Sequence, residues 1–151
     1  MAYHRILVPV DGSAASQRGV EEALRLAQAL DARVSMLHVL DSAPIVAAPD
    51  MAAYVPQVID DLRLAGQQIA EQAKARADAA GVGSDVILAD AGGRPVFEAI
   101  IEQAQRVDAD LLVMGTHGRR GIARVLMGSD AEGVVRNARV PVMLVRGPEE
   151  G

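Results

Sequence analysis

The stretch Leu111–Val135 reads LLVMGTHGRRGIARVLMGSDAEGVV and joins a short apolar run to two groups of glycines. The run Leu111–Met114 has the composition of a buried strand, and Ser129–Asn137 has that of a short helix. Glycines at the end of a strand permit a positive φ or let another group approach the main chain closely. The stretch therefore predicts a strand, a glycine-rich connection and a helix. It also raises the question of whether protein or a ligand lies against the glycines.

Strand-like and helix-like patterns alternate along the whole chain. Apolar runs typical of buried strands lie at Arg5–Val10, Ala32–Leu40, Ser84–Asp90, Leu111–Met114 and Val140–Val145. Patterns typical of helices lie at Ala14–Leu30, Val58–Ala80, Phe97–Val107 and Ser129–Asn137. This alternation predicts an α/β fold, with a five-stranded parallel sheet in the order 3-2-1-4-5 and helices on both faces. We expect one domain over residues 1–147 and a flexible tail at 148–151.

The segment Asp41–Gln57 contains Pro44, Pro49 and Pro56 and predicts a long loop after the second strand. Loops of this length in compact domains are often lids or mobile segments. We interpret the segment as a candidate lid over a ligand site.

The composition of the 151 residues excludes several classes of function. Aromatic residues make up 2% and the net charge is −5, which disfavours a nucleic-acid partner because such partners need stacking platforms and basic surfaces. The absence of cysteine excludes disulfides and thiolate catalysis, and the three histidines are not spaced as metal ligands. No apolar run is long enough to span a membrane, and the first residues do not form a signal peptide. We expect a soluble cytoplasmic protein.

In a sheet of this order, ligands bind beyond the carboxyl ends of the strands, where the strand order reverses. The reversal is predicted between the first strand, which ends near Asp11, and the fourth, which ends near Gly115. Gly115, Gly118 and Gly121 free backbone N–H groups to point at an anion. Ser129, as the N-cap of the last helix, places further N–H groups there. Positive charge is supplied nearby by Arg119, Arg120 and Arg124.

Each of these features also has a purely structural interpretation. Gly115 can simply end a strand, and Ser129-x-x-Glu132 is a capping box that needs no ligand. The arginines can form a solvated face. The joint spacing, rather than any single residue, favours an anion site.

The joint spacing Gly115-x2-Gly118-x9-Gly128-Ser129 resembles the nucleotide-binding motif of the universal stress protein family. Four stretches resemble the family in the same order, namely ILVPVDGS, MLHVLD, ADLLVMGTHGRRG and RVPVMLV, so that the resemblance covers nearly the whole chain. It implies a single Rossmann-like domain of the adenine nucleotide α-hydrolase-like type. It also implies ATP as the ligand, alone or with Mg²⁺.

The resemblance further implies a role for each residue of the motif. Pro9 and Asp11 line the adenosine end, and Val39 packs against the adenine. Met114 lies beneath the ribose. The ribose and phosphates are wrapped by Gly115, Thr116, His117, Gly118, Arg119, Arg120 and Gly121, and the phosphates are met from the helix side by Gly128, Ser129 and Asp130. No catalytic residue and no metal ligand is assigned.

Asp130 departs from the family pattern, in which the residue after Gly-Ser is often apolar. A carboxylate in the first turn of a helix complements the helix dipole, but it also repels a triphosphate. Three outcomes remain open: Mg²⁺ bridges the two, Asp130 points away, or the affinity for ATP is reduced.

Three hypotheses for the function follow. The first is an ATP-binding stress-response regulator that changes conformation or protein partner with nucleotide occupancy. The second is a slow ATPase, in which Arg119 or Arg124 stabilises developing charge. The third is an interaction module without a nucleotide, because an uncovered apolar strand at a sheet edge invites pairing. The resemblance also implies homodimers joined through the last strand, at Val140, Val142, Met143, Leu144 and Val145.

Two other classes share the fold pattern, of which the first is rejected and the second is disfavoured. A phosphoacceptor receiver domain needs a cluster of acidic residues after the first strand and a lysine near the last, whereas Asp11 stands alone and Val140–Gly147 contains no lysine. A flavin protein is disfavoured by the scarcity of aromatic residues to cover the flavin ring.

Overall fold

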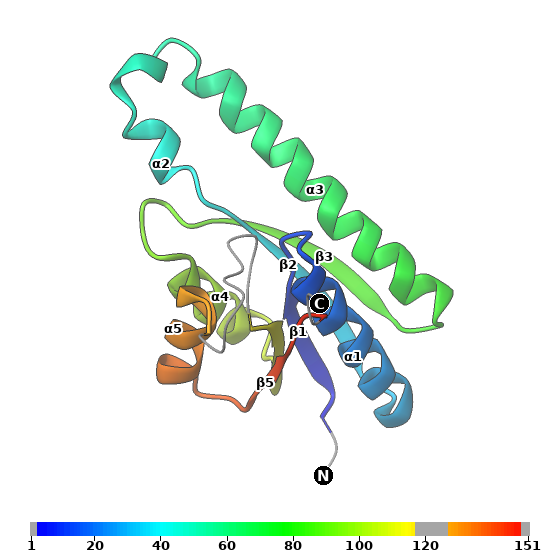
Figure 1. Cartoon of the computed structure of the whole chain (residues 1–151). Coiled ribbons are helices and arrows are strands. Elements are labelled where there is room, and N and C mark those ends of the chain that lie inside the picture. The colour runs from blue at the N-terminus through cyan, green and yellow to red at the C-terminus, as the bar shows by residue number, and fades with distance from the viewer. Residues whose placement is uncertain (1–2, 117–126, 149–151) are drawn as a thin grey trace.

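The computed structural model describes residues 3–116 and 127–148, which form a parallel sheet layered between helices (Figure 1). The strands of this sheet are β1 (Arg5–Pro9), β2 (Arg33–Leu40), β3 (Ser84–Asp90), β4 (Leu111–Gly115) and β5 (Val142–Val145). All neighbouring strands are parallel, in the order β3-β2-β1-β4-β5. The predicted fold class and strand order are therefore confirmed.

Helices cover both faces of the sheet, as predicted. One face packs against α1 (Ala14–Leu30) and α3 (Val55–Ala79), and the other packs against α4 (Val96–Arg106) and α5 (Ser129–Asn137) (Figure 1). None of the helices in the described part of the chain combines the length and the apolar character needed to cross a bilayer.

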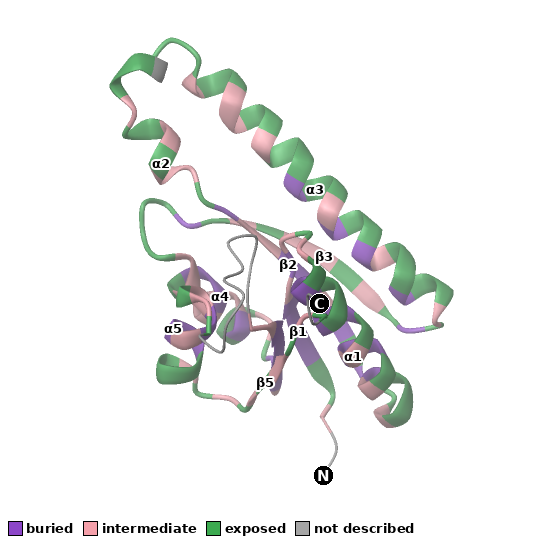
Figure 2. Ribbon diagram, in the orientation of Figure 1, coloured by how far each residue is buried: buried purple, intermediate pink, exposed green. Residues whose placement is uncertain are grey.

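Alternation along β1 divides the core between the two faces. Ile6 and Val8 belong to the cluster on the side of α1 and α3, whereas Leu7 belongs to the cluster on the side of α4 and α5. All three side chains are at most 1% exposed, and burying side chains of this size contributes about 1.5–3 kcal/mol each. The middle of this central strand is therefore buried on both faces (Figure 2), which explains the unbroken apolar run at residues 6–8.

Helix α1 begins where the sequence supplies a cap. Ser13 is the N-cap, and its Oγ accepts a hydrogen bond from the N–H of Ser16 at 3.1 Å. Asp31 ends the helix in the left-handed conformation, with φ at 54°. The buried residues recur at helical spacing: Ala15, Ser16, Gly19, Val20, Ala23, Leu24 and Ala27. This face fixes α1 on the sheet and places the turn that precedes it at the carboxyl edge of the strands.

The prediction of a long loop at Asp41–Gln57 is wrong, because much of the segment is helical. It contains α2 (Ala43–Val46) and the 3-10 helix η1 (Pro49–Met51), and α3 already begins at Val55. Each of the three prolines lies in the first turn of one of these elements, where its fixed φ suits a helix and its missing N–H is not needed. The N-terminal part of α3 and the segment before it project beyond the sheet (Figure 1). A lid role for this segment stays a prediction.

The last strand is shorter than predicted, because β5 begins at Val142 and leaves Val140 outside the strand. Pro141 has no N–H with which to extend the ladder of hydrogen bonds. Its carbonyl still accepts a hydrogen bond from the N–H of Leu112 at 3.0 Å.

Candidate functional site

The carboxyl ends of the parallel strands meet at one edge of the sheet. Pro9 ends β1 and Asp11 follows it, while Val39 lies one residue before the end of β2. Met114 and Gly115 end β4. β1 pairs with β2 on one side and with β4 on the other, so the strand order reverses between β1 and β4. The fold therefore brings these five predicted site residues to the edge where α/β sheets bind ligands.

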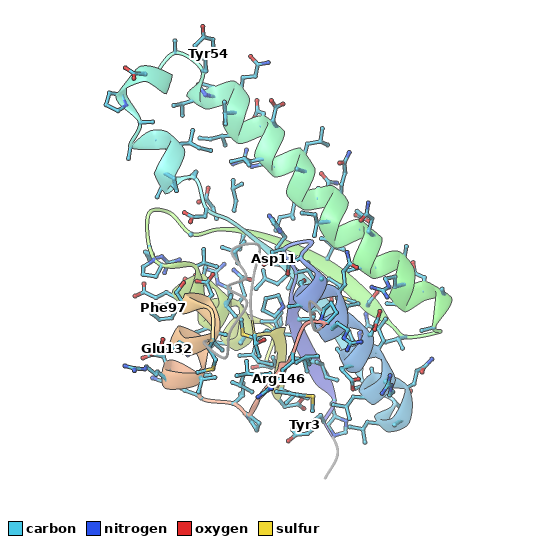
Figure 3. All side chains as sticks on the ribbon, in the orientation of Figure 1. Tyr3, Asp11, Tyr54, Phe97, Glu132 and Arg146 are labelled. Carbon is cyan, nitrogen blue, oxygen red and sulfur yellow. The ribbon has the colours of Figure 1, made fainter. Side chains whose placement is uncertain are left out.

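Asp11 lies in the turn from β1 to α1 (Figure 3), where hydrogen bonds hold it. Its N–H donates to Oγ of Ser16 at 3.1 Å, and its Oδ1 accepts from the N–H of Ser13 at 2.9 Å. Gly12 has φ at 80°, a conformation that other residues rarely adopt. Asp11 is half-buried, so the turn fixes its carboxylate at the sheet edge.

The close neighbour of Gly115 is helix α1. A methyl group at Gly115 would lie 2.7 Å from the carbonyl carbon of Ala15 and 2.8 Å from its oxygen. Gly19, one turn further along α1, also faces Gly115. A methyl group added at Gly19 would lie 3.4 Å from the N atom of Gly115. Packing against α1 is thus sufficient to require glycine at position 115. At this residue it is protein, rather than a ligand, that lies against the glycine.

Thr116 holds together the two ends of the glycine motif. Its N–H donates to the carbonyl of Val145 at 3.0 Å, and its carbonyl accepts from the N–H of Gly128 at 2.7 Å. The Oγ1 atom of Thr116 is buried and has no hydrogen-bond partner among residues 3–116 and 127–148. A buried hydroxyl without a partner is energetically costly, and this one lies beside the predicted anion site.

The remaining predicted residues of the loop lie outside the described residues: His117, Gly118, Arg119, Arg120, Gly121 and Arg124. Their roles stay predictions. In the part of the chain that the structure describes, no group of three or more His, Asp or Glu side chains comes close enough to hold a metal ion.

Helix α5 begins at Ser129, but the prediction that Ser129 is its N-cap is wrong. The N-cap is Gly128, which has extended backbone angles and whose carbonyl accepts from the N–H of Glu132 at 3.0 Å. The Glu132 carboxylate pairs with Arg136 at 2.8 Å, one turn further along the helix. A capping box headed by Ser129 is therefore not formed. Asp130 lies half-buried in the first turn of α5, where a carboxylate complements the helix dipole.

His38 also lies near this edge, and the sequence alone indicates no role for it. Its Nδ1 lies 2.8 Å from the carbonyl oxygen of Val10, and its ring lies against Gly66 of α3. The only signal in the sequence is a polar residue inside an otherwise apolar strand, MLHVL. Nothing local in the sequence indicates which carbonyl the ring would contact.

A cavity of about 280 Å³ opens between α1 and α3, next to the same turn, where Val10, Gly12 and Ser16 form part of its lining. A second cavity of about 280 Å³ lies between the end of α4 and the start of β5, at the opposite edge of the sheet. The first cavity borders the site from the α1 face, whereas the second is remote from it.

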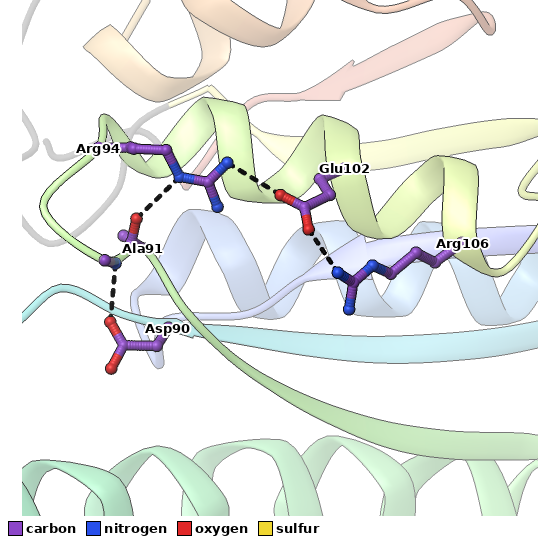
Figure 4. A network of polar contacts seen from close by, with 6 residues as sticks. Asp90, Ala91, Arg94, Glu102 and Arg106 are labelled. Carbon is purple, nitrogen blue, oxygen red and sulfur yellow. Dashed lines mark hydrogen bonds and ion pairs between the residues drawn. The ribbon is translucent and has the colours of Figure 1, made fainter.

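The turn from β3 to α4 at the carboxyl edge is fixed by a polar network (Figure 4). Nε of Arg94 donates to the carbonyl of Ala91 at 3.1 Å. Arg94 and Arg106 both pair with Glu102, at 2.9 Å and 2.7 Å. The hydrogen bond from Arg94, together with the charges of both arginines, holds the pKa of Glu102 below its ordinary value.

Both the sequence and the fold of this chain resemble those of known proteins. The model of the universal stress protein family matches residues 2–146. The universal stress protein MJ0531 of Methanocaldococcus jannaschii is 36% identical over 149 residues, which cover 98% of this chain and 85% of that one. The solved structure of the hypothetical protein MJ0577 has the same fold, with a TM-score of 0.85 at 22% identity over 99% of this chain and 100% of that one.

A third relative was solved with a ligand. It is a universal stress protein in complex with cAMP, which superposes with a TM-score of 0.63 at 28% identity and covers 98% of this chain and 100% of that one. The family match and the 36% identity both extend over nearly the whole chain. The chain therefore belongs to the universal stress protein family.

Proposed function

We propose that the protein binds an adenine nucleotide, with ATP as its preferred ligand, at the carboxyl ends of β1 and β4. As a stress-response regulator, it exchanges protein partners according to whether the nucleotide is bound. The relative that was solved with cAMP supports an adenine nucleotide. The spacing Gly115-x2-Gly118-x9-Gly128-Ser129 supports a ligand with phosphates.

The observation that carries this proposal is the hydrogen bond from the N–H of Gly128 to the carbonyl of Thr116, at 2.7 Å. It sets the amino end of α5 beside the carboxyl end of β4. The N–H groups in the first turn of a helix have no acceptor inside the helix, and together with the helix dipole they favour a phosphate. We therefore assign the phosphates to Gly128, Ser129 and Asp130.

The other assignments follow from position at the sheet edge. The carboxylate of Asp11, with Pro9 and Val39 beside it, faces the adenosine end. Met114 supports the ribose. The Oγ1 of Thr116, which is buried without a partner among the described residues, finds its partner in an oxygen of the ligand. The segment from Gly115 to Gly121 completes the wall around the ribose and phosphates.

Two buried hydroxyls make a matched test of this site. Ser84 Oγ, like Thr116 Oγ1, is buried without a hydrogen-bond partner among the described residues, but Ser84 begins β3 at the opposite edge of the sheet. Thr116→Val and Ser84→Ala each remove such a hydroxyl, so both variants should keep or raise the melting temperature. Only Thr116→Val should weaken ATP binding, by about 1 kcal/mol or roughly fivefold in Kd.

The measurement is a calorimetric titration of ATP, with and without Mg²⁺, into nucleotide-free protein. Gly118→Val is a further variant, expected to abolish binding because a side chain would block the approach of the phosphates to the main chain. If the wild type does not bind ATP, the proposal fails and an interaction module without nucleotide becomes the leading account. If Thr116→Val binds as the wild type does, Thr116 is not part of the site.

We further propose that two copies pair through β5. This strand lies at the edge of the sheet, and its residues Val142, Met143, Leu144 and Val145 are all apolar. Met143 is 37% exposed. Val140, which precedes the strand, flanks the proposed interface. An uncovered apolar edge of this kind favours pairing with another chain.

A further inference from the structure

We infer that His38 is a positioning residue for the nucleotide site, which acts through the peptide bond between Val10 and Asp11. The inference rests on the proposed function, because Asp11 is assigned there to the adenosine end. His38 itself lies on β2, with its ring toward α3 rather than at the glycine motif. Its effect on a ligand is therefore indirect.

The imidazole of His38 holds the last peptide group of β1. Its Nδ1 lies 2.8 Å from the carbonyl oxygen of Val10, and because a carbonyl can only accept, Nδ1 carries the hydrogen. The N–H of Val10 donates to the carbonyl of Leu37 at 2.7 Å. Val10 is 5% exposed, and the imidazole supplies the hydrogen-bond donor at its carbonyl. Both backbone polar groups of Val10 are thus held by β2.

Helix α3 closes the other side of the ring. A methyl group at Gly66 would collide with Cδ2 of His38 and would lie 2.6 Å from its Nε2. Gly66 is buried, so the ring has no room to turn toward α3. His38 is therefore fixed between a helix on one side and the Val10 carbonyl on the other.

Fixing the Val10 carbonyl also fixes Asp11. The carbonyl of Val10 and the N–H of Asp11 belong to one planar peptide unit, and that N–H donates to Oγ of Ser16 at 3.1 Å. The orientation of this plane sets the direction in which the Asp11 side chain leaves the strand. Without the His38 donor this plane is held at one end only, by the bond to Ser16, and we expect the looser plane to align the Asp11 carboxylate less well with the ligand.

A pair of matched variants tests this role. Asparagine places an amide nitrogen where Nδ1 of histidine lies, whereas leucine has the same branching without a donor. We expect His38→Leu to weaken ATP binding by about tenfold and His38→Asn to restore it to within about threefold of the wild type. Val34→Ala is the control, because Val34 is fully buried on the same face of β2 but far from the carboxyl edge. It should lower the melting temperature and leave Kd unchanged.

A second readout separates the failure of this inference from the failure of the proposed function. Hydrogen exchange at the amides of Asp11 and Ser13 is measured in the nucleotide-free proteins. It should be at least tenfold faster in His38→Leu, close to wild type in His38→Asn, and unchanged in Val34→Ala after correction for global stability.

Each result supports or overturns the inference. If the wild type binds ATP and His38→Leu binds equally well, or if His38→Asn is as weak as His38→Leu, the inference is overturned. If the wild type binds no ATP, the proposed function fails, and the exchange rates alone test the inference. Equal exchange rates in His38→Leu and wild type would then overturn the inference. Should His38→Leu not fold, His38→Gln replaces it with the same expectation, because its amide lies one bond too far from the backbone to occupy the Nδ1 position.

Discussion

At Gly115 the main chain of β4 approaches α1 so closely that a methyl group would lie 2.7 Å from the carbonyl carbon of Ala15. Backbone atoms cannot move away as the end of a flexible side chain can, so Gly115→Ala should push α1 off β4. We expect a loss of about 1–3 kcal/mol in the free energy of unfolding, as for other overpacked sites. Urea denaturation measures this loss.

Gly19 provides the matched control for this prediction. It lies on α1 opposite Gly115, but its methyl position is 3.4 Å from the nearest backbone atom, which is ordinary contact. Because alanine favours a helix over glycine by up to about 1 kcal/mol, Gly19→Ala should be neutral or stabilising. A Gly115→Ala variant as stable as the wild type would show that the two elements can separate without loss.

The proposed phosphate site makes Asp130 a test of how ATP binding depends on Mg²⁺. Asp130 lies in the first turn of α5, beside which the phosphates are proposed, and two like charges about 5–7 Å apart near a surface repel by roughly 1 kcal/mol after screening. Asp130→Asn should therefore tighten ATP binding about fivefold without Mg²⁺. With Mg²⁺ the gain should disappear, because a metal ion bound with the nucleotide would offset the repulsion between the carboxylate and the phosphates. Calorimetry under both conditions measures the two affinities.

Glu132→Gln is the control for Asp130→Asn, because both acids lie in the first turn of α5 and both complement the dipole. The Glu132 carboxylate is directed along the helix, where it pairs with Arg136, so its neutralisation should leave the affinity within about twofold. Equal affinities for Asp130→Asn and wild type under both conditions would mean that Asp130 points away from the ligand.

At the scale of elements, the junction between β3 and α4 predicts a dependence of stability on pH. Glu102 pairs with both Arg94 and Arg106, and its pKa in the folded protein is lowered from the ordinary value of 4.5. A group whose pKa falls on folding stabilises the protein at pH above the unfolded value, and this contribution is lost as pH falls through the folded pKa. Glu102→Gln should therefore lower the melting temperature at pH 7 and have no effect at pH low enough to protonate Glu102 in the folded protein.

The control for the junction is Glu22→Gln, which breaks an exposed pair with a single partner, Arg25. A single exposed pair contributes little, so this variant should change the melting temperature less than Glu102→Gln does at pH 7. Thermal unfolding of wild type and both variants across the acidic range gives the comparison. A loss in Glu102→Gln that persists unchanged at low pH would mean that packing, rather than charge, holds the junction.

The order of elements could be predicted because apolar runs of strand length alternate with helical patterns, and such alternation leaves few possible sheets. The carboxyl edge that carries the candidate site followed from that order. The residues that cap the helices were harder to predict. Ser129 has the side chain of a typical N-cap, yet the N-cap of α5 is Gly128. Long-range contacts could not be predicted, because the bond between His38 and Val10 joins residues 28 positions apart and no local pattern encodes it.

At the scale of the whole molecule, β5 is an outer strand of the sheet, and its backbone geometry bears on the proposed dimer. The carbonyl of Pro141, just before β5, accepts a hydrogen bond from the N–H of Leu112 in β4, and the carbonyl of Val145, in β5, accepts one from the N–H of Thr116, just after β4. Successive residues of a strand direct their backbone groups to opposite sides. The backbone groups of Val142 and Leu144 therefore face away from β4, toward the position that a second copy would occupy.

This geometry makes the proposed dimer testable at one atom. Val142→Pro removes the outward N–H of Val142 without touching the hydrogen bonds to β4, and proline is tolerated on an edge strand when its nitrogen faces outward. Val142→Ala removes most of the same side chain but keeps the N–H. Sedimentation velocity should find the wild type and Val142→Ala as dimers and Val142→Pro as a monomer that retains the circular dichroism spectrum of the wild type.

If Val142→Pro remains a dimer, the copies do not pair through the backbone of β5. If the wild type is itself a monomer at the concentrations measured, β5 is an open edge, and pairing with another protein would have to be sought there.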